Sequence, residues 1–413
     1  MTGNYSDAQM LERIRPAYSS RPAPSTVQVL KTTVRLAAQR SNPCAEALSA
    51  FALGRLTQAA NVAESRLWFE RAEKSFAAAQ SPTGLAHVHF ALASSGRNTK
   101  SSAEVTASFA QVADEFERAG DAHGALTARI HAVDRKRSEL QEVFGPLLRQ
   151  AQQLGDPVIQ AQIHHSWGDE LFTRGHYNEA THQYQLSDDL YMACRCQYDQ
   201  RAALQTSLGR IERIQGRAMA AIPHYRLALS LQQKADDQYL IPQTLNAISV
   251  AYESMGQYQH AIAYVQQALS IARAIHSQEF IDFLEANLGA LYAKAGQPQR
   301  GLPLLQRATA KLANDYQRCT RYQQLADLYI QLKQPDEAEQ AITQSIDACE
   351  RDQSRRSLAD GLETRAKIRA GSGSLEDALA DARRSLTLIE EISAHVVPED
   401  AHRRGYNQAT LQT

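Results

Sequence analysis

The chain has 413 residues, with 44 Lys and Arg against 45 Asp and Glu, which gives a net charge of −1. This balance argues against a general nucleic-acid binder, because a phosphate-binding face usually shifts the total charge. No window approaches the roughly 18 uninterrupted apolar residues of a membrane span. Five cysteines, an odd number, do not suggest a disulfide framework, and the N-terminus lacks the apolar core of a signal peptide. We therefore expect a reducing, cytoplasmic compartment.

Composition also favours an all-α fold. The chain holds only 13 prolines and 20 glycines, against abundant Ala, Leu, Gln, Arg and Glu. Residues 1–24 contain Pro16, Pro22 and Pro24 with serines between them, and we expect this segment to be flexible. Residues 25–40 have the apolar spacing of an amphipathic helix, which would cap the first helical hairpin.

Three degenerate helical hairpins follow this cap. In the first, which begins near Ala52, we expect Trp68, Phe69 and Ala72 to be core residues of its second helix. Residues 82–118 and 122–154 are interpreted as two more hairpins. The junctions before Asp121 and Asp156 end one helix and supply an acidic residue that can cap the next.

Regular repeats begin at residue 157. Glycines stand at 175, 216, 256 and 296, with Lys333 and Gly373 in the next two equivalent places, so the spacings are 41, 40, 40, 37 and 40. About seven residues before each of these places stands a residue that is often small, such as Gly168 or Gly209, and five after it stands Ala or Gly. Small residues in these places let two helices approach closely, and the glycine between them would supply a left-handed cap.

These residues resemble the tetratricopeptide repeat, whose pattern is W-x2-L-G-x2-Y followed by Ala and a large residue. Tyr252, Tyr292 and Tyr329 fill the tyrosine place, whereas Leu171 and Glu212 depart from it. The period near 40 is similar to the long-helix repeats of kinesin light chains, of bacterial peptide-sensing regulators and of bacterial signalling proteins. The resemblance implies a right-handed α-solenoid.

A last hairpin, residues 358–389, is broken at Gly371–Ser374, so the sequence predicts about nine hairpins. We divide the chain into a flexible segment (1–24), degenerate hairpins with their cap (25–156), a regular array (157–394) and a tail (395–413). Residues 382–406 also resemble, more weakly, the segment that joins bacterial tetratricopeptide arms to CHAT-type caspase-like proteases. No catalytic His/Cys pair can be assigned from that resemblance.

Three motifs suggest chemistry and are better explained by structure. Cys194 and Cys196 are two residues apart, so on a helix their thiolates would point in different directions and could not easily share a metal. His164 and His165, which precede Asp169 and Glu170, lack the H-E-x-x-H pattern and a third ligand. The glycines near 372 lack the Gly-Lys-Ser/Thr of a phosphate loop. We expect no metal and no cofactor.

The resemblance implies that the first helix of each repeat lines a concave binding face. Carrying the family's inward positions onto this sequence gives the candidate partner-binding residues. Asn246 and Asn287 are included because an asparagine amide can both donate to and accept from a peptide backbone. The full set is Gln162, His165, Asp169, Phe172, Arg210, Arg213, Gln243, Asn246, Glu253, Phe283, Asn287, Gln323 and Asp327.

We therefore predict a non-catalytic scaffold or adaptor that binds a protein or peptide segment on its concave face, without nucleic acid or membrane. Two alternatives remain open. One is a sensor arm that controls an effector on another chain, such as a caspase-like protease. The other is a signalling regulator whose superhelix tightens around a small peptide. An autonomous enzyme is the least favoured reading. The sequence leaves the partner and the oligomeric state undecided.

Overall fold

The computed structural model describes residues 24–396, except 59–61, 97–100, 134–138, 195, 236, 311 and 313. Across these residues the secondary structure is helical, with nineteen α-helices and no strand. The prediction of an all-α fold is confirmed. The predicted flexible segment and the predicted tail lie almost wholly outside the described residues.

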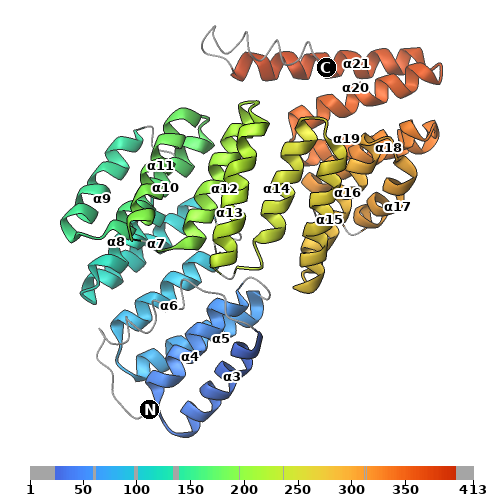
Figure 1. The fold of residues 1–413 in the computed structure, drawn as a ribbon. Coiled ribbons are helices and arrows are strands. Elements are labelled where there is room, and N and C mark those ends of the chain that lie inside the picture. Colours follow the sequence, from blue (N-terminus) through green and yellow to red (C-terminus); the bar gives the residue numbers. More distant parts are fainter. Residues whose placement is uncertain are drawn as a thin grey trace. The chain divides into compact units, whose positions relative to one another are not determined.

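The chain divides into two compact units, residues 1–240 and 241–413 (Figure 1). Helices of the first unit are α3 (Pro24–Gln39), α4 (Pro43–Thr57), α5 (Val62–Ala78), α6 (Pro82–Ser95), α7 (Ser102–Arg118), α8 (Ala122–His131), α9 (Leu140–Leu154), α10 (Pro157–Thr173), α11 (Tyr177–Cys194), α12 (Tyr198–Ile214) and α13 (Ala218–Lys234). Helices of the second unit are α14 (Ile241–Ser254), α15 (Tyr258–Ala274), α16 (Gln278–Lys294), α17 (Pro298–Thr309), α18 (Asp315–Gln331), α19 (Pro335–Asp352), α20 (Arg355–Gly371) and α21 (Leu375–Val396).

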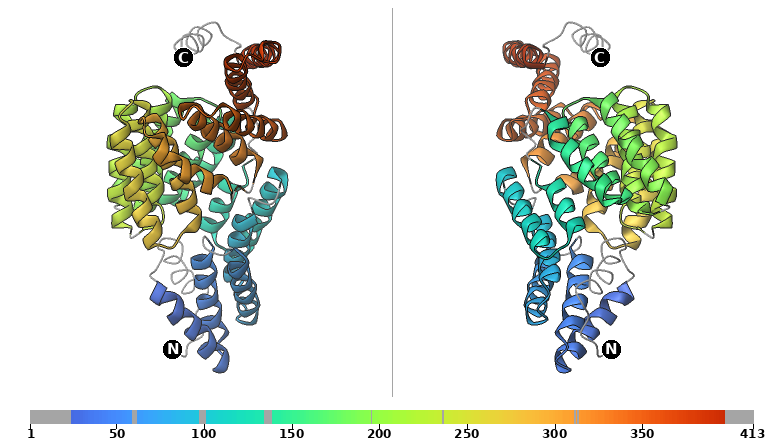
Figure 2. Two further views of the ribbon diagram at one scale, coloured as in Figure 1. Left: turned by 90° about the vertical axis from the view of Figure 1, so that its right-hand side faces the viewer. Right: turned by 90° about the vertical axis from the view of Figure 1, so that its left-hand side faces the viewer.

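Helices α4 to α21 form nine successive hairpins, and within each unit successive hairpins pack on one another (Figures 1 and 2). The predicted number of hairpins is therefore confirmed. Helix α3 packs on α4, as expected of a cap, and buries Val34 and Ala37. Phe69 and Ala72 of α5 are fully buried, and Trp68 packs against the same core.

The repeated glycines end the first helix of each regular hairpin. Gly175, Gly216, Gly256, Gly296 and Gly373 all have positive φ, between 71° and 89°. Lys333, which stands in the glycine place of its repeat, has a φ of 59° and adopts the same left-handed conformation. The backbone therefore requires a left-handed residue at each joint, whether or not the sequence supplies glycine.

Close helix packing explains the small residues. A Cβ on Gly168 would lie 2.6 Å from Cε1 of Tyr184, and Gly209 stands in the same relation to Tyr225. A serine of the second helix also donates a hydrogen bond to a first-helix carbonyl 26 residues earlier. Three hairpins share this bond: Ser187 to Ala161 (2.7 Å), Ser345 to Cys319 (2.6 Å) and Ser385 to Ala359 (2.8 Å).

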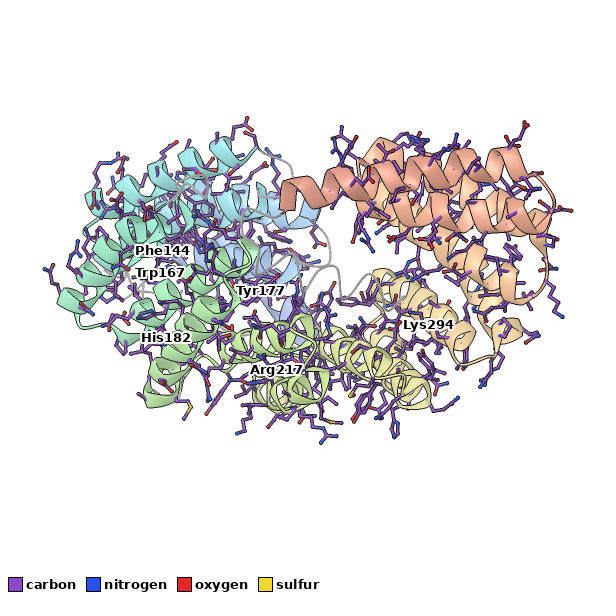
Figure 3. The ribbon with its side chains drawn as sticks, turned by 90° about the horizontal axis from the view of Figure 1, so that it is seen from above. Phe144, Trp167, Tyr177, His182, Arg217 and Lys294 are labelled. Carbon is purple, nitrogen blue, oxygen red and sulfur yellow. A yellow bond between two sulfur atoms is a disulfide. The ribbon has the colours of Figure 1, made fainter. Side chains whose placement is uncertain are left out.

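Trp167 belongs to the core of the first unit, as the repeat frame predicts. Its ring stacks on Phe144 of α9 with 5.6 Å between centroids and 13° between planes (Figure 3). Both side chains belong to one apolar cluster that includes the buried Tyr184 and Tyr191. Contacts of this kind join the degenerate hairpin α8–α9 to the regular array.

The expectation that the cysteines form no disulfide bonds is wrong. Disulfides join Cys194 to Cys196 and Cys319 to Cys349, and Cys44 is buried as a free thiol. The helix argument does not apply to the first pair, because Cys194 is the last residue of α11 and Cys196 lies beyond its end. The second pair faces itself across the hairpin α18–α19, where small residues bring the helices together.

Among the described residues, no helix combines the length and apolar character needed to cross a bilayer.

Candidate functional site

A cavity of about 710 Å³ lies on the first helices of five successive hairpins in the first unit. We call it the α6–α8–α10 groove, because these helices supply most of its lining; Arg55 of α4, Phe116 of α7 and the start of α12 complete it. Its lining residues are Arg55, His87, Phe90, Phe116, Asp121, His123, Gly124, Thr127, Ile130, His131, Asp156, Val158, Ile159, Gln162, His165, Ser166, Asp169, Gln197 and Gln200.

Two acidic helix caps shape the groove. Asp121 caps α8 by accepting the backbone N–H of Gly124 (2.9 Å), and Asp156 caps α10 by accepting that of Val158 (2.8 Å). Each cap uses one carboxylate oxygen, and the other oxygen turns toward the histidine of a neighbouring helix. His123 Nδ1 is hydrogen-bonded to Asp156 at 2.7 Å, and His87 Nε2 lies 3.7 Å from Asp121. Folding of the hairpins thus places both acids in the groove.

Helix α10 brings three of the predicted residues, Gln162, His165 and Asp169, into this groove. The Tyr184 hydroxyl donates a hydrogen bond to Asp169 (2.8 Å), and burial together with this acid raises the pKa of Tyr184. Burial lowers the pKa of His165, although Asp169, 3.8 Å away, acts in the opposite direction. At neutral pH His165 is therefore an uncharged group that can donate or accept one hydrogen bond.

The same groove has an aromatic portion. Phe90 packs against Phe109 and His131, with ring centroids 5.3 and 5.4 Å apart. Phe116 is buried beside His87. Apolar rings next to carboxylates and imidazoles make a surface that suits a peptide, because a peptide offers apolar side chains and backbone hydrogen-bonding groups together.

The remaining predicted residues of the first unit, Phe172, Arg210 and Arg213, do not line this groove. Arg210 of α12 stacks over the ring of Phe172, with its guanidinium carbon 4.7 Å from the ring centroid. Arg213 lies near the hydroxyl of Tyr225 and lowers its pKa, although burial raises that pKa overall. Both cations are therefore held against aromatic residues of the array and do not line the groove.

In the second unit, four predicted residues bond to side chains on neighbouring first helices. Asn287 donates to Asn246 (3.0 Å) and accepts from Arg321 (2.9 Å). Lys294 pairs with Glu253 at 2.6 Å, and Gln323 donates to Thr364 at 3.0 Å. Each of these pairs except Asn287–Arg321 spans 41 residues, so equivalent positions of adjacent repeats are neighbours.

Three predicted residues of the second unit are exposed. They are Gln243 on α14, Phe283 on α16 and Asp327 on α18. The Arg321 guanidinium lies 5.5 Å from the centre of the Phe283 ring.

Nothing in the described part of the chain forms a group of three or more His, Cys, Asp or Glu residues that could hold a metal ion. His164 is instead hydrogen-bonded to Gln183 (2.7 Å), and Glu170 is paired with Arg174. The groove acids are engaged by helix caps, imidazoles and a tyrosine, and these contacts orient polar groups for binding.

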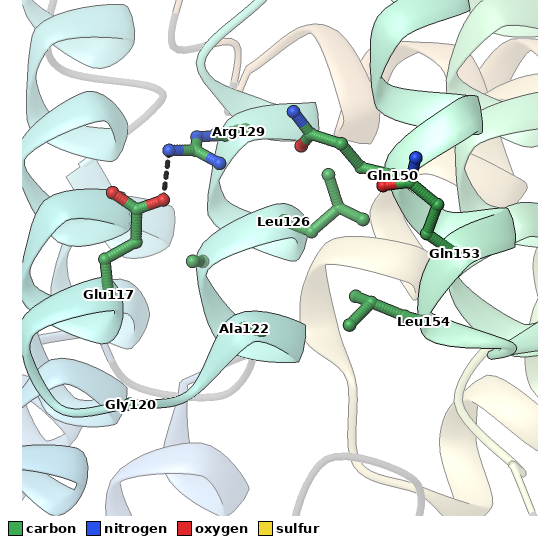
Figure 4. A pocket seen from close by; sticks show the side chains of 9 residues that line it. Glu117, Gly120, Ala122, Leu126, Arg129, Gln150, Gln153 and Leu154 are labelled. Carbon is green, nitrogen blue, oxygen red and sulfur yellow. Dashed lines mark hydrogen bonds and ion pairs between the residues drawn. The ribbon is translucent and has the colours of Figure 1, made fainter.

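A second cavity, of about 480 Å³, lies between α7, α8 and α9 (Figure 4). Glu117 and Arg129 form an ion pair on one side of it, and Gln150, Gln153 and Leu154 of α9 lie opposite. It is smaller, and none of the predicted residues lines it.

Sequence reasoning missed the groove residues on α6 and α8. Their hairpins lack the repeat signature, so no family position could be assigned to His87, Phe90, His123 or His131. The signal that could have found them is the junction pattern: Asp121 and Asp156 were recognised as caps, and their neighbours on the first helices line the groove.

Comparison with known proteins agrees with this geometry. A tetratricopeptide-repeat family model matches residues 200–274, and a second model of the same repeat matches residues 320–352. The matches cover three of the nine hairpins in whole or large part, and the other hairpins repeat their architecture. Residues 200–274 and 320–352 are therefore tetratricopeptide repeats.

Two solved structures share the fold at low sequence identity. The apo form of RapI is 11% identical with a TM-score of 0.51, over 70% of this chain and 99% of its own. A STAND protein with a tetratricopeptide-repeat sensor, PH0952 from Pyrococcus horikoshii, is 13% identical with a TM-score of 0.53, over 90% of this chain and 54% of its own. A search of curated protein sequences gives no match. These likenesses support an α-solenoid fold.

Proposed function

We propose that this protein is a non-catalytic adaptor that binds a protein or peptide segment in the α6–α8–α10 groove. The observation that carries the proposal is the groove itself: a cavity of about 710 Å³ whose lining comes from successive first helices. First helices form the binding face of helical-repeat proteins, because stacking leaves them on the inner side.

The lining also fits an extended segment better than a small polar metabolite. Phe90, Ile130 and Val158 offer apolar contact, while Gln162, Gln197 and Gln200 offer amides along the groove. Amides can pair with both the N–H and the C=O groups of a peptide backbone. A segment of a few residues would thus bury apolar side chains and satisfy its backbone in the same place.

The residues predicted on the inner face of the second unit are proposed as further contact residues. Asn246, Asn287, Glu253 and Gln323 are already hydrogen-bonded or ion-paired to neighbouring repeats. The exposed Gln243, Phe283 and Asp327 are the members of this set with most surface to offer.

The groove can be tested with a displayed library of random peptides, selected on the purified chain and measured by fluorescence anisotropy. Thr127→Arg places a long side chain in the cavity and is expected to weaken selected peptides at least about tenfold. Ala107→Arg on the exposed face of α7 is the matched control and should bind as the parent does. Failure to select any peptide, or equal binding by both variants, would contradict the proposal.

A second candidate is a sensor arm that controls a separate effector. The observation that favours it is the fold likeness over 90% of this chain to a protein whose solenoid is described as a sensor. Under this hypothesis, deleting residues 395–413 abolishes effector binding and leaves the melting temperature unchanged. The adaptor hypothesis instead expects the deletion variant to keep its groove-bound peptide.

A further inference from the structure

Helix α21 closes the described array and has an apolar outer face. Leu375, Leu379 and Leu386 are 67%, 51% and 57% exposed. The opposite face of α21 is buried against α20 through Ala378, Asp381 and Ser385. Helix α21 therefore has one face that is buried against α20 and a second, apolar face that no described residue covers.

The residues equivalent to Leu386 in earlier hairpins are buried against the next hairpin. Leu386 lies eight residues after Ala378, the small residue near the start of the second helix, and each earlier hairpin of the second unit has an equivalent position. Leu269, Thr309 and Ile346 hold this place in successive hairpins and are 4%, 8% and 2% exposed. Ile346 contacts Gly361 of the next hairpin, where a Cβ would lie 3.2 Å away. Leu386 holds the same place in α21, so it stands on a face that elsewhere packs on a following helix.

We propose that this face is the interface between two copies of this chain. Leu375, Leu379, Ala382, Leu386 and Ile389 are spaced four, three, four and three residues apart. That spacing keeps one apolar seam in line along a helix and is the pattern by which two helices pack side by side.

Charge along the edge of the seam favours an antiparallel copy. Glu376, Arg383 and Glu390 are seven residues apart, almost two full turns, so they form one row beside the leucines. A two-fold axis between Leu386 and Thr387 would set Arg383 opposite Glu390 of the second copy, and Glu390 opposite its Arg383. The two ion pairs are reciprocal, as an isologous interface requires.

The segment that follows α21 is a poorer occupant. Residues 397–413 contain Val397, Tyr406 and Leu411 as their larger apolar side chains. This leaves few apolar groups to cover three leucines, whereas a second α21 supplies an equal number.

The test is the molar mass of the full chain by sedimentation equilibrium. At about 100 µM, a concentration suited to the small interface of one helix pair, the parent is expected at twice the mass of one chain. Leu386→Glu should be monomeric with unchanged helicity, and its melting temperature should equal that of the parent at dilutions where the parent is monomeric too, because Leu386 is exposed in one chain. Leu67→Glu changes a leucine that is 66% exposed on α5 and should remain dimeric. A monomeric parent, or a dimeric Leu386→Glu variant, overturns the proposal.

Charge exchange tests the antiparallel arrangement separately. Arg383→Glu and Glu390→Arg each place like charges opposite one another, so each alone should self-associate at least about tenfold more weakly. Mixed together, they restore both ion pairs, and a one-to-one complex is expected. If the mixture stays monomeric while the parent is dimeric, the two-fold antiparallel pairing is wrong.

Discussion

Gly168 and Tyr184 are in direct contact across the hairpin α10–α11, so closely that a Cβ on Gly168 would lie 2.6 Å from the tyrosine ring. No bulkier residue fits unless the ring moves, and the ring is held by the hydrogen bond from its hydroxyl to Asp169. This pair therefore sets the separation of the two helices, and it lies beside the groove.

The first prediction follows from this contact. Gly168→Ala is expected to lower the free energy of unfolding by about 1–3 kcal/mol, because the added methyl overpacks a buried interface. Urea denaturation followed by circular dichroism measures the change. Gly371→Ala is the control: no atom would approach the new Cβ within 4 Å, so it should be neutral or slightly stabilising. Equal stability of the two variants would show that the α10–α11 contact is soft.

A second prediction concerns the joint at Lys333. Its φ of 59° is the left-handed conformation that the other joints give to glycine. Lys333→Gly should raise the free energy of unfolding by about 1 kcal/mol, because glycine adopts this conformation without steric cost. Lys367→Gly, within the exposed face of α20, should lower it by a similar amount. A melting temperature that falls for Lys333→Gly contradicts the expectation.

A third prediction concerns the buried Asp381. It pairs with Arg365 (2.7 Å) and Arg369 (3.0 Å) between α20 and α21. Asp381→Asn leaves the largely buried Arg365 guanidinium without its ion-pair partner, while Arg369 keeps its pair with Glu339, and should cost about 3 kcal/mol. The exposed pair of Glu363 and Lys367 supplies the control, since Glu363→Gln should cost less than about 1 kcal/mol.

The Asp381 carboxyl should also make the free energy of unfolding depend on pH in the acid range. Burial raises the pKa of Asp381, but hydrogen bonds and charge from Arg365 and Arg369 outweigh it and leave the pKa below 3.8. Its contribution is therefore present above pH 3.8 and is lost as the pH falls through the folded-state pKa. The difference in stability between the parent and Asp381→Asn should shrink over that range. An unchanged difference would show that the pairing is not ionic.

A fourth prediction uses His89 on α6. Burial lowers the pKa of His89, but Glu115 and then Glu73 raise it, and the net shift is upward from 6.5. Protonated His89 therefore stabilises the fold fully below pH 6.5, and this contribution is lost as the pH rises through the higher folded-state pKa. The parent should lose stability relative to His89→Gln over this interval, as measured by thermal melts at several pH values. Parallel pH profiles would refute the prediction.

Repeat-level features could be predicted from the sequence because each has a local cause. The left-handed joints follow from single glycines, and the close contacts of Gly168 and Gly209 follow from their places in the frame. The site was only partly predictable. Gln162, His165 and Asp169 line the groove because α10 keeps the family pattern. His87 and His123 do not belong to a recognisable repeat, so their inward position depends on packing that no local pattern encodes.

The cysteine pairing failed for a related reason. Cys319 and Cys349 are 30 residues apart, and only the crossing of α18 and α19 brings their side chains together. Cys194 and Cys196 can form a disulfide because α11 ends at Cys194, and the apolar periodicity of the sequence does not predict that end.

The bonds between equivalent positions of the second unit also bear on how its superhelix can deform. Asn246–Asn287, Glu253–Lys294 and Gln323–Thr364 each tie one repeat to the next at nearly constant sequence separation. Any tightening or opening of the coil would change the geometry of these bonds, because each joins equivalent positions of adjacent repeats. The geometry of these inner-face hydrogen bonds and ion pairs therefore depends on the pitch of the superhelix. A ligand that replaced one of these bonds would remove a tie between two adjacent repeats and free them to turn relative to each other.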